Sequence, residues 1–170
     1  PPLLRSHTCG QLRAEHIGQE VTLCGWVDTS RDHGGTLFID LRDRYGKTQV
    51  VFAPEAGPAI LEESRKLRTE DVVRVTGKIA HRPEGTTNQK LATGEIELRA
   101  KTLEILNKCN NAPFFPTALE LPGEELRLTY RYLDLRRPEM QRTLALRSDM
   151  IVAMRNYFAE HDFLDVETPI

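Results

Sequence analysis

One stretch of alternating residues decides the fold of this chain: Gly35-Thr36-Leu37-Phe38-Ile39-Asp40-Leu41-Arg42. Successive side chains of a β-strand point to opposite faces of the sheet, so the three aliphatic residues share one face, which must be the core. Phe38 lies on the other face with Asp40 and Arg42, and we expect that face to meet water. An aromatic ring exposed among charges is suited to stacking on an unpaired base. The structural alternative is that Phe38 packs beneath a loop or a helix.

Similar alternation on both sides of this strand predicts four more strands, at Glu20–Asp28, Thr48–Phe52, Asp71–Ile79 and Glu95–Leu106. Apolar residues at helical spacing predict a helix at Pro58–Leu67, and a shorter one at Cys9–Ile17. A turn is expected at Arg31–Gly35. Five short strands with a helix between the third and fourth are typical of the OB-fold, a five-stranded barrel that binds nucleic acid across its second and third strands. The predicted fold class is therefore mainly β, with an OB-fold barrel at residues 1–106.

The composition changes after this barrel. Residues 107–141 are rich in proline and then in arginine and tyrosine, which predicts a linker or hinge. Residues 142–170 begin another domain, with a helix of about five turns at Arg142–His161. The last stretch, Phe163–Ile170, alternates like a strand but has no partner in the chain. We therefore expect this chain to be the front part of a longer protein.

The bulk composition limits the classes of function. The 170 residues carry a net charge of −2, so any nucleic-acid site must be a local patch rather than a uniformly basic surface. No apolar run approaches the ~20 residues of a membrane span, and no signal peptide opens the chain, which favours a cytoplasmic protein without a membrane partner. Cys9, Cys24 and Cys109 form neither a zinc motif nor a disulfide framework, so no metal site is expected.

The same alternation places further polar residues beside Phe38. Gln49 and Glu97 point outward from their strands, and Arg31 precedes the first turn. An aromatic ring can stack on a base, an amide can read a base edge, a carboxylate can accept from base N–H groups, and a guanidinium can meet a phosphate. The alternative for Gln49 and Glu97 is an ordinary solvated strand face.

Four segments resemble bacterial-type aspartyl-tRNA synthetase: Leu23-Cys24-Gly25-Trp26-Val27, Phe38–Asp43, Ala92–Glu97 and Tyr130–Pro138. The resemblance runs from about Arg5 to Ile170. The string Arg-Tyr-Leu-Asp-Leu-Arg-Arg-Pro within Tyr130–Pro138 is highly specific, because related lysine enzymes share Tyr-Leu-Asp-Leu but usually not the residues after it. Phe163–Ile170 resembles the start of motif 1 of class II synthetases, with Pro169 as its proline.

The resemblance implies that the OB-fold barrel binds a tRNA anticodon. Phe38 then matches the residue that stacks on the middle base, and Gln49 matches a reader of that base. Glu97 matches the acceptor for the first base, guanine or queuine. Arg31 and Asn88 match supporting contacts. The implied partner is tRNA(Asp), not DNA.

The resemblance also implies a homodimer through the motif 1 region and an α+β class II catalytic domain that starts at residue 142. ATP and Mg²⁺ belong to motifs 2 and 3 of the full-length enzyme, so no catalytic residue, cofactor site or metal site is expected among residues 1–170. The full-length enzyme would form aspartyl-adenylate from aspartate and ATP, and then transfer aspartate to tRNA.

His33 and Gly85 resemble the subgroup of these enzymes that charges both tRNA(Asp) and tRNA(Asn). The two tRNAs differ in the third anticodon base, cytosine against uracil. A neutral histidine can donate or accept a hydrogen bond, and glycine leaves a loop free to adjust. The alternative is that both are simply turn residues.

Two other classes of function remain open. A non-catalytic OB-fold protein that binds single-stranded nucleic acid would show the same barrel pattern. A purely structural dimerisation module would explain the helix at Arg142–His161 but not the outward Phe38.

Overall fold

The computed structural model describes residues 4–167 of the chain. They form two compact units, one ending at Ala112 and the other beginning at Pro113. The division into residues 1–106, 107–141 and 142–170 stays a prediction.

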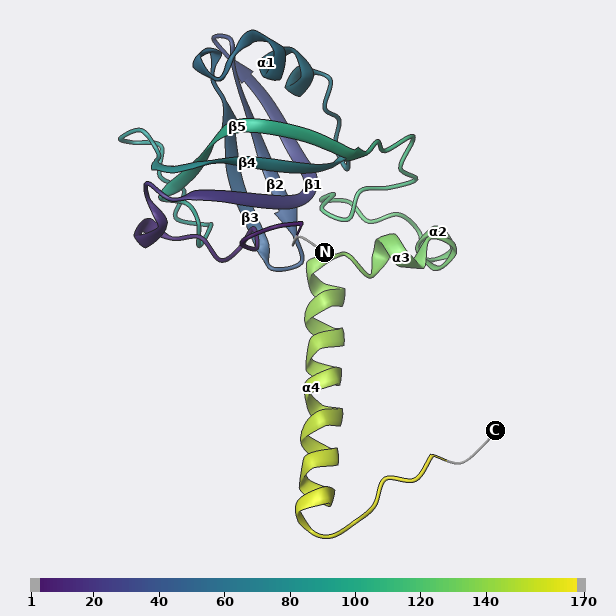
Figure 1. The fold of residues 1–170 in the computed structure, drawn as a ribbon. Coiled ribbons are helices and arrows are strands. Elements are labelled where there is room, and N and C mark those ends of the chain that lie inside the picture. Colours follow the sequence, from purple (N-terminus) through teal and green to yellow (C-terminus); the bar gives the residue numbers. More distant parts are fainter. Residues whose placement is uncertain (1–3, 168–170) are drawn as a thin grey trace. The chain divides into compact units, whose positions relative to one another are not determined.

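The first unit is a closed five-stranded barrel with the strand order β1-β2-β3-β5-β4 (Figure 1). The strands are β1 (Glu20–His33), β2 (Thr36–Asp43), β3 (Gly46–Phe52), β4 (Val72–His81) and β5 (Ile96–Asn107). β3 and β5 pair in parallel and all other neighbours pair antiparallel. Helix α1 (Pro58–Arg65) follows the short 3-10 helix η2 (Pro54–Ala56) and lies at one end of the barrel. The predicted OB-fold is confirmed.

Alternating aliphatic residues fill the barrel. Leu37, Ile39 and Leu41 of β2 are at most 4% exposed, as the alternation predicts. Val50, Phe52, Ile96 and Leu98 complete the same interior from β3 and β5. Burial of such side chains contributes about 1.5–3 kcal/mol each, which makes the register of the strands costly to change.

The predicted helix at Cys9–Ile17 is wrong. Only the 3-10 helix η1 (Ala14–His16) forms there. The chain before η1 lies against the β2–β3 turn: the Cys9 N–H donates to the Asp43 carboxylate at 2.8 Å. A Cβ at Gly10 would lie 2.0 Å from the Tyr45 carbonyl oxygen. These contacts hold the chain before η1 close to the β2–β3 turn.

β1 is five residues longer than predicted and contains a bulge at Asp28. Val27 pairs with Leu41, whereas Thr29 pairs with Asp40, so Asp28 is an extra residue in the ladder. A bulge of this kind reverses which side chains face outward beyond it. The strand continues to His33, and the turn itself is only Gly34–Gly35, whose φ angles of 60° and 87° suit a two-residue hairpin. The predicted turn at Arg31–Gly35 is therefore too long.

The expectation that Arg42 meets water is wrong, because the residue is only 5% exposed. Its Nε donates to Asp28 Oδ1 at 3.1 Å, and its guanidinium also pairs with Glu70. Lys47 pairs with the other oxygen of Asp28. The bulge thus places the Asp28 carboxylate next to Arg42 at the end of β2. The charged side chains there are buried, and they can be buried because they pair with one another.

The second unit contains α2 (Glu124–Thr129), α3 (Arg131–Asp134) and α4 (Pro138–Glu160). α4 begins four residues earlier than predicted because Pro138 suits the first helical position. The carboxylate of Asp134 is fully buried and accepts from Arg131 and Arg137 at 2.5 and 3.0 Å.

No residue of α4 is buried, and its apolar side chains are open. The predicted strand at Phe163–Ile170 is not formed over residues 163–167, and Pro169 lies outside the described residues. Among the helices described, none is long and apolar enough to cross a membrane.

Candidate nucleic-acid interface

The outer face of the barrel and the loop between β4 and β5 enclose a pocket of about 340 Å³. The pocket is lined by Arg31, His33, Phe38, Gln49, Arg82, Pro83, Thr86 and Asn88. Five of the seven anticodon-site residues predicted from the sequence therefore surround one space. Glu97 lies directly behind Gln49, and Gly85 lies in the loop without lining the pocket.

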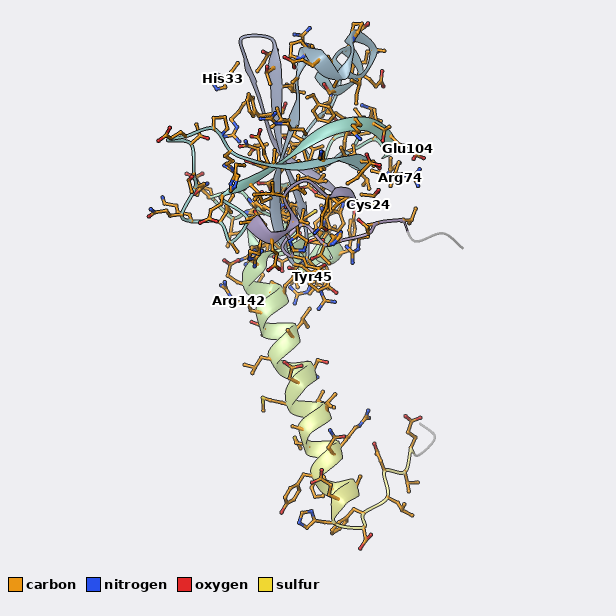
Figure 2. The ribbon with its side chains drawn as sticks, turned by 60° about the vertical axis from the view of Figure 1, so that its left-hand side comes forward. Cys24, His33, Tyr45, Arg74, Glu104 and Arg142 are labelled. Atoms are coloured by element: carbon orange, nitrogen blue, oxygen red, sulfur yellow. The ribbon has the colours of Figure 1, made fainter. Side chains whose placement is uncertain are left out.

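Phe38 forms the apolar floor of this pocket. Arg31 is its direct partner across β1 and β2, so the two side chains stand on the same face. The His33 ring meets Phe38 edge-to-face with centroids 6.2 Å apart. Figure 2 shows His33 on the outside of the barrel, on the β1–β2 hairpin. Phe38 is half-buried rather than open to bulk water, and it lines the pocket, where an aromatic ring can stack on a base.

Arg31 is held in place by a carboxylate. Its Nη2 lies 3.2 Å from both oxygens of Asp40. The Thr29 hydroxyl donates to the same carboxylate at 2.6 Å. Half of the Arg31 side chain remains exposed, so its other N–H groups can meet an anionic or carbonyl oxygen. The bulge at Asp28 is what brings Thr29 and Arg31 to this face.

Gln49 and Glu97 lie on the outer face as predicted, but they do not reach water. Their exposed fractions are 8% and 3%. Gln49 Nε2 donates to Glu97 Oε2 at 3.2 Å, and Arg99 Nε donates to Glu97 Oε1 at 3.3 Å. The β4–β5 loop crosses this part of the sheet, where the Thr93 hydroxyl donates to the Lys47 carbonyl. The loop therefore turns a sheet face into the wall of a pocket.

The loop is shaped by two glycines. Gly85 has a φ of 79° in the turn that Thr86 N–H closes onto the Pro83 carbonyl, which is the position where glycine is needed. Gly94 passes so close to Asn88 that a Cβ would lie 1.8 Å from the Asn88 carbonyl oxygen. Gly85 acts on the pocket through the turn that carries Pro83 and Thr86, and Gly94 permits the position of Asn88.

Arg82 is a pocket residue that the sequence reasoning missed. Its Nε donates to the Ile96 carbonyl at 3.1 Å, and its Nη2 is buried without a hydrogen-bond partner among the described residues. Burial lowers the pKa of this guanidinium, and the carboxylates of Asp40 and Glu97 partly oppose that effect. A buried donor without an acceptor is costly, so a phosphate or carbonyl oxygen of a ligand would bind favourably to Nη2.

The signal for Arg82 was present in the alternation of β4. Ala80 pairs with Glu97, so Arg82 continues the same outward row two residues later. The strand was predicted to end at Ile79, so the prediction did not place Arg82 on the outer face.

The pocket offers an aromatic ring, two guanidinium groups and two amides, and the buried carboxylate of Glu97 lies behind Gln49. This set can stack a base, hold a phosphate and distinguish donors from acceptors on a base edge. Within residues 4–167, no group of three His, Cys, Asp or Glu side chains could hold a metal ion. A larger pocket of about 460 Å³ borders α4 in the second unit, but apolar residues such as Ile151, Met154 and Phe158 dominate its lining. It resembles an open packing surface rather than a polar binding site.

Two curated relatives match nearly the whole chain. It is 58% identical to "Aspartate--tRNA(Asp/Asn) ligase" of Rhodopirellula baltica over 169 residues, which cover 99% of this chain and 28% of the relative. It is 50% identical to the protein of the same name from Salinibacter ruber, over 98% of this chain and 27% of that protein. The chain thus spans little more than a quarter of the length of these relatives.

A solved structure agrees with this likeness. The asparaginyl-tRNA synthetase of Pyrococcus horikoshii, complexed with asparaginyl-adenylate, matches with a TM-score of 0.82 and 28% identity. The match covers 96% of this chain and 36% of that one.

Two family models also match. Residues 123–170 match the model of tRNA synthetases class II (D, K and N). Residues 21–106, half of the chain, match the model described as OB-fold nucleic acid binding domain. The barrel, its pocket and these matches agree, and the chain belongs to the family of OB-fold nucleic acid binding domains.

Proposed function

We propose that this chain is the anticodon-binding front part of an aspartate–tRNA ligase, and that the pocket beside Phe38 receives anticodon bases of tRNA(Asp) and tRNA(Asn). The observation that carries the proposal is the pocket itself. It combines a half-buried aromatic ring with a buried amide and a guanidinium whose Nη2 has no acceptor among the described residues. The names of the two curated relatives favour the same function.

Each side chain has a role in this proposal. Phe38 stacks on the middle anticodon base, and Gln49 contacts its edge. Arg31 and Arg82 hold phosphate or carbonyl oxygens. His33 and Asn88 lie at the rim, where either third base can be accommodated because a neutral imidazole can donate or accept.

The remaining activity is assigned to the full-length enzyme. There, aspartate and ATP would form aspartyl-adenylate, and the aspartyl group would then move to the tRNA. The binding of ATP and Mg²⁺ is likewise proposed for the full-length enzyme. The open apolar side of α4 is proposed to pack in the homodimer of that enzyme, in the cytoplasm.

The test is aminoacylation by the full-length protein. Transcripts of tRNA(Asp) and tRNA(Asn) should both accept aspartate, and transcripts with a purine at the middle anticodon position should accept it at least tenfold less efficiently. A protein that charges neither tRNA, but binds any single strand equally well, would be a general single-strand binding protein and would refute the proposal.

A further inference from the structure

A second polar pocket lies in the barrel unit at the point where the chain leaves β5. Its volume is about 230 Å³. The segment between α1 and β4 and the residues directly after β5 line it, with the side chains Lys66, Arg68, Asp71, Lys108, Cys109 and Asn110. Three of the six are cations and one is a carboxylate, although the whole chain carries a net charge of −2. The pocket is thus a local basic patch on a chain that is not basic overall.

The carboxylate in this pocket is already paired within the protein. Asp71 is fully buried, and its Oδ2 accepts from the Arg68 N–H at 2.9 Å and from Lys108 Nζ at 3.1 Å. Its Oδ1 accepts from the Cys109 N–H at 2.8 Å. Lys108 Nζ also donates to the Lys66 carbonyl at 3.2 Å, which joins the two segments of the pocket. The charges of Asp71 and Lys108 therefore cancel, and the charges of Lys66 and Arg68 remain.

Arg68 is an exposed cation on a fixed backbone. Its N–H donates to the Asp71 carboxylate, and its carbonyl accepts from the Asp71 N–H at 3.1 Å. Its guanidinium makes no hydrogen bond or ion pair within residues 4–167. A guanidinium carries five N–H donors in a planar fork that matches two oxygens of a phosphate. Arg68 is therefore placed to bind an anion without first breaking a contact of its own.

Lys66 supplies the second charge. Its Nζ lies 3.0 Å from Glu63 Oε2 and 4.0 Å from Glu62 Oε1, and all three side chains are well exposed. Exposed ion pairs of this kind are weak, so Lys66 Nζ can exchange a carboxylate for a phosphate oxygen at little cost. Together, Lys66 and Arg68 can meet one phosphate group from two sides of the pocket.

This basic pocket and the anticodon pocket lie at opposite ends of β4. Asp71 directly precedes the strand, and Arg82 directly follows it. Figure 1 shows β4 and β5 side by side, with the β4–β5 loop at one end and the chain leaving β5 at the other. A strand of ten residues spans roughly 30 Å. An RNA bound by its anticodon would have to extend about that far to reach the basic pocket.

We propose that Lys66 and Arg68 bind a backbone phosphate of the tRNA, outside the anticodon loop. This inference rests on the proposed function, in which the same tRNA must also reach the catalytic part of the enzyme. That part follows the barrel along the chain, and the chain leaves the barrel at this pocket. A phosphate contact of this kind adds affinity and orientation but reads no base.

Arg68→Gln tests the site because it removes the charge and leaves the backbone contacts with Asp71 in place. The thermal unfolding of this variant should match the wild type, since the guanidinium has no partner to lose. Arg68→Lys keeps the charge and should restore most of the RNA affinity. The matched control is Lys101→Gln: Lys101 is an exposed cation of β5 that pairs with Glu20 and does not line the pocket.

The measurement is the affinity of the full-length protein for a complete tRNA(Asp) transcript over a series of salt concentrations. We expect Arg68→Gln to lower this affinity about three- to tenfold at low salt. It should also reduce the slope of log affinity against log salt by about one, as for the loss of one phosphate contact. Lys101→Gln should change neither quantity. A minimal anticodon hairpin, too short to reach the basic pocket, should bind Arg68→Gln and the wild type equally.

Three results would overturn the inference. Unchanged tRNA affinity and salt slope in Arg68→Gln would show that no phosphate of the tRNA is bound, as would be the case if the pocket served an acidic protein segment. Equal losses for the complete tRNA and the minimal hairpin would show that Arg68 acts on the anticodon pocket instead. Binding of inorganic phosphate that requires Arg68, together with unchanged tRNA affinity, would indicate a site for a free anion. A wild type that binds tRNA(Asp) no better than an unrelated RNA of the same length refutes the proposed function itself.

Discussion

Replacing Arg82 by methionine should weaken RNA binding without destabilising the protein. In the free protein, Arg82 Nη2 is buried without an acceptor among the described residues. Removing a buried donor of this kind recovers about 1–3 kcal/mol, whereas losing the Nε hydrogen bond to the Ile96 carbonyl costs about 1 kcal/mol. We therefore expect the free energy of unfolding to rise by about 0–2 kcal/mol.

The effect on binding should have the opposite sign. A charged donor that pairs with a phosphate or carbonyl oxygen contributes about 1.5–3 kcal/mol, so its loss should lower the affinity for an anticodon stem-loop by about 10- to 150-fold. The assay is a fluorescence titration of the full-length protein, with thermal unfolding recorded on the same samples. Methionine keeps most of the apolar length of the side chain, which limits any packing defect.

Arg74→Met is the matched control, since Arg74 belongs to β4 and makes an exposed ion pair with Glu104. Exposed pairs of this kind contribute about 0–1 kcal/mol, so neither stability nor affinity should change much. An Arg82→Met variant that unfolds at a clearly lower temperature, while its stem-loop affinity stays within twofold of the wild type, would contradict this prediction. Arg82 would then be a structural residue and not a ligand contact.

Three further changes give distinct outcomes. His33→Leu should reduce aspartylation of tRNA(Asn) more than that of tRNA(Asp). Equal activity on both tRNAs would show that His33 does not take part in recognition of the third anticodon base. Gly94→Ala should displace Asn88 and lower stem-loop affinity at least fivefold, because its Cβ would lie 1.8 Å from the Asn88 carbonyl oxygen; unchanged affinity would show that the loop does not shape the site. Burial raises the pKa of Asp71, but hydrogen bonds from the Cys109 and Arg68 N–H groups and from Lys108 outweigh it and lower the pKa overall. A lowered folded-state pKa stabilises the protein above the unfolded value of about 3.9 and ceases to do so as pH falls through the folded value. Asp71→Asn should therefore unfold earlier than the wild type at pH 7, and the gap should close below about pH 4; a constant gap would contradict the assignment.

The alternation of apolar residues was enough to predict the barrel. Residues such as Leu37 and Ile39 are buried as their spacing indicates, because a shift of one residue would expose every one of them. The same parity also predicted that Phe38, Gln49 and Glu97 share the outer face. Local patterns of period two carry this information directly.

Three features could not be found in that way. The bulge at Asp28 interrupts the alternation of β1, and a local pattern gives no sign of an extra residue in a ladder. The burial of Gln49 and Glu97 depends on the β4–β5 loop, which is distant in sequence from Gln49, so strand alternation alone could not show that this face is a pocket wall. Arg42 is buried for the same reason, because its partners Asp28 and Glu70 come from other segments.

The affinity of Phe38→Ala for the anticodon stem-loop tests most directly the claim that this pocket receives an anticodon base. Stacking of a base on an aromatic ring contributes about 1–3 kcal/mol, so the affinity of the full-length protein should fall by about 5- to 150-fold. Tyr45→Ala is the control, because Tyr45 is an aromatic residue with 55% exposure at the β2–β3 turn and lies outside the pocket. We expect a loss of affinity for Phe38→Ala alone. Unchanged affinity for Phe38→Ala, or an equal loss for both variants, would contradict it.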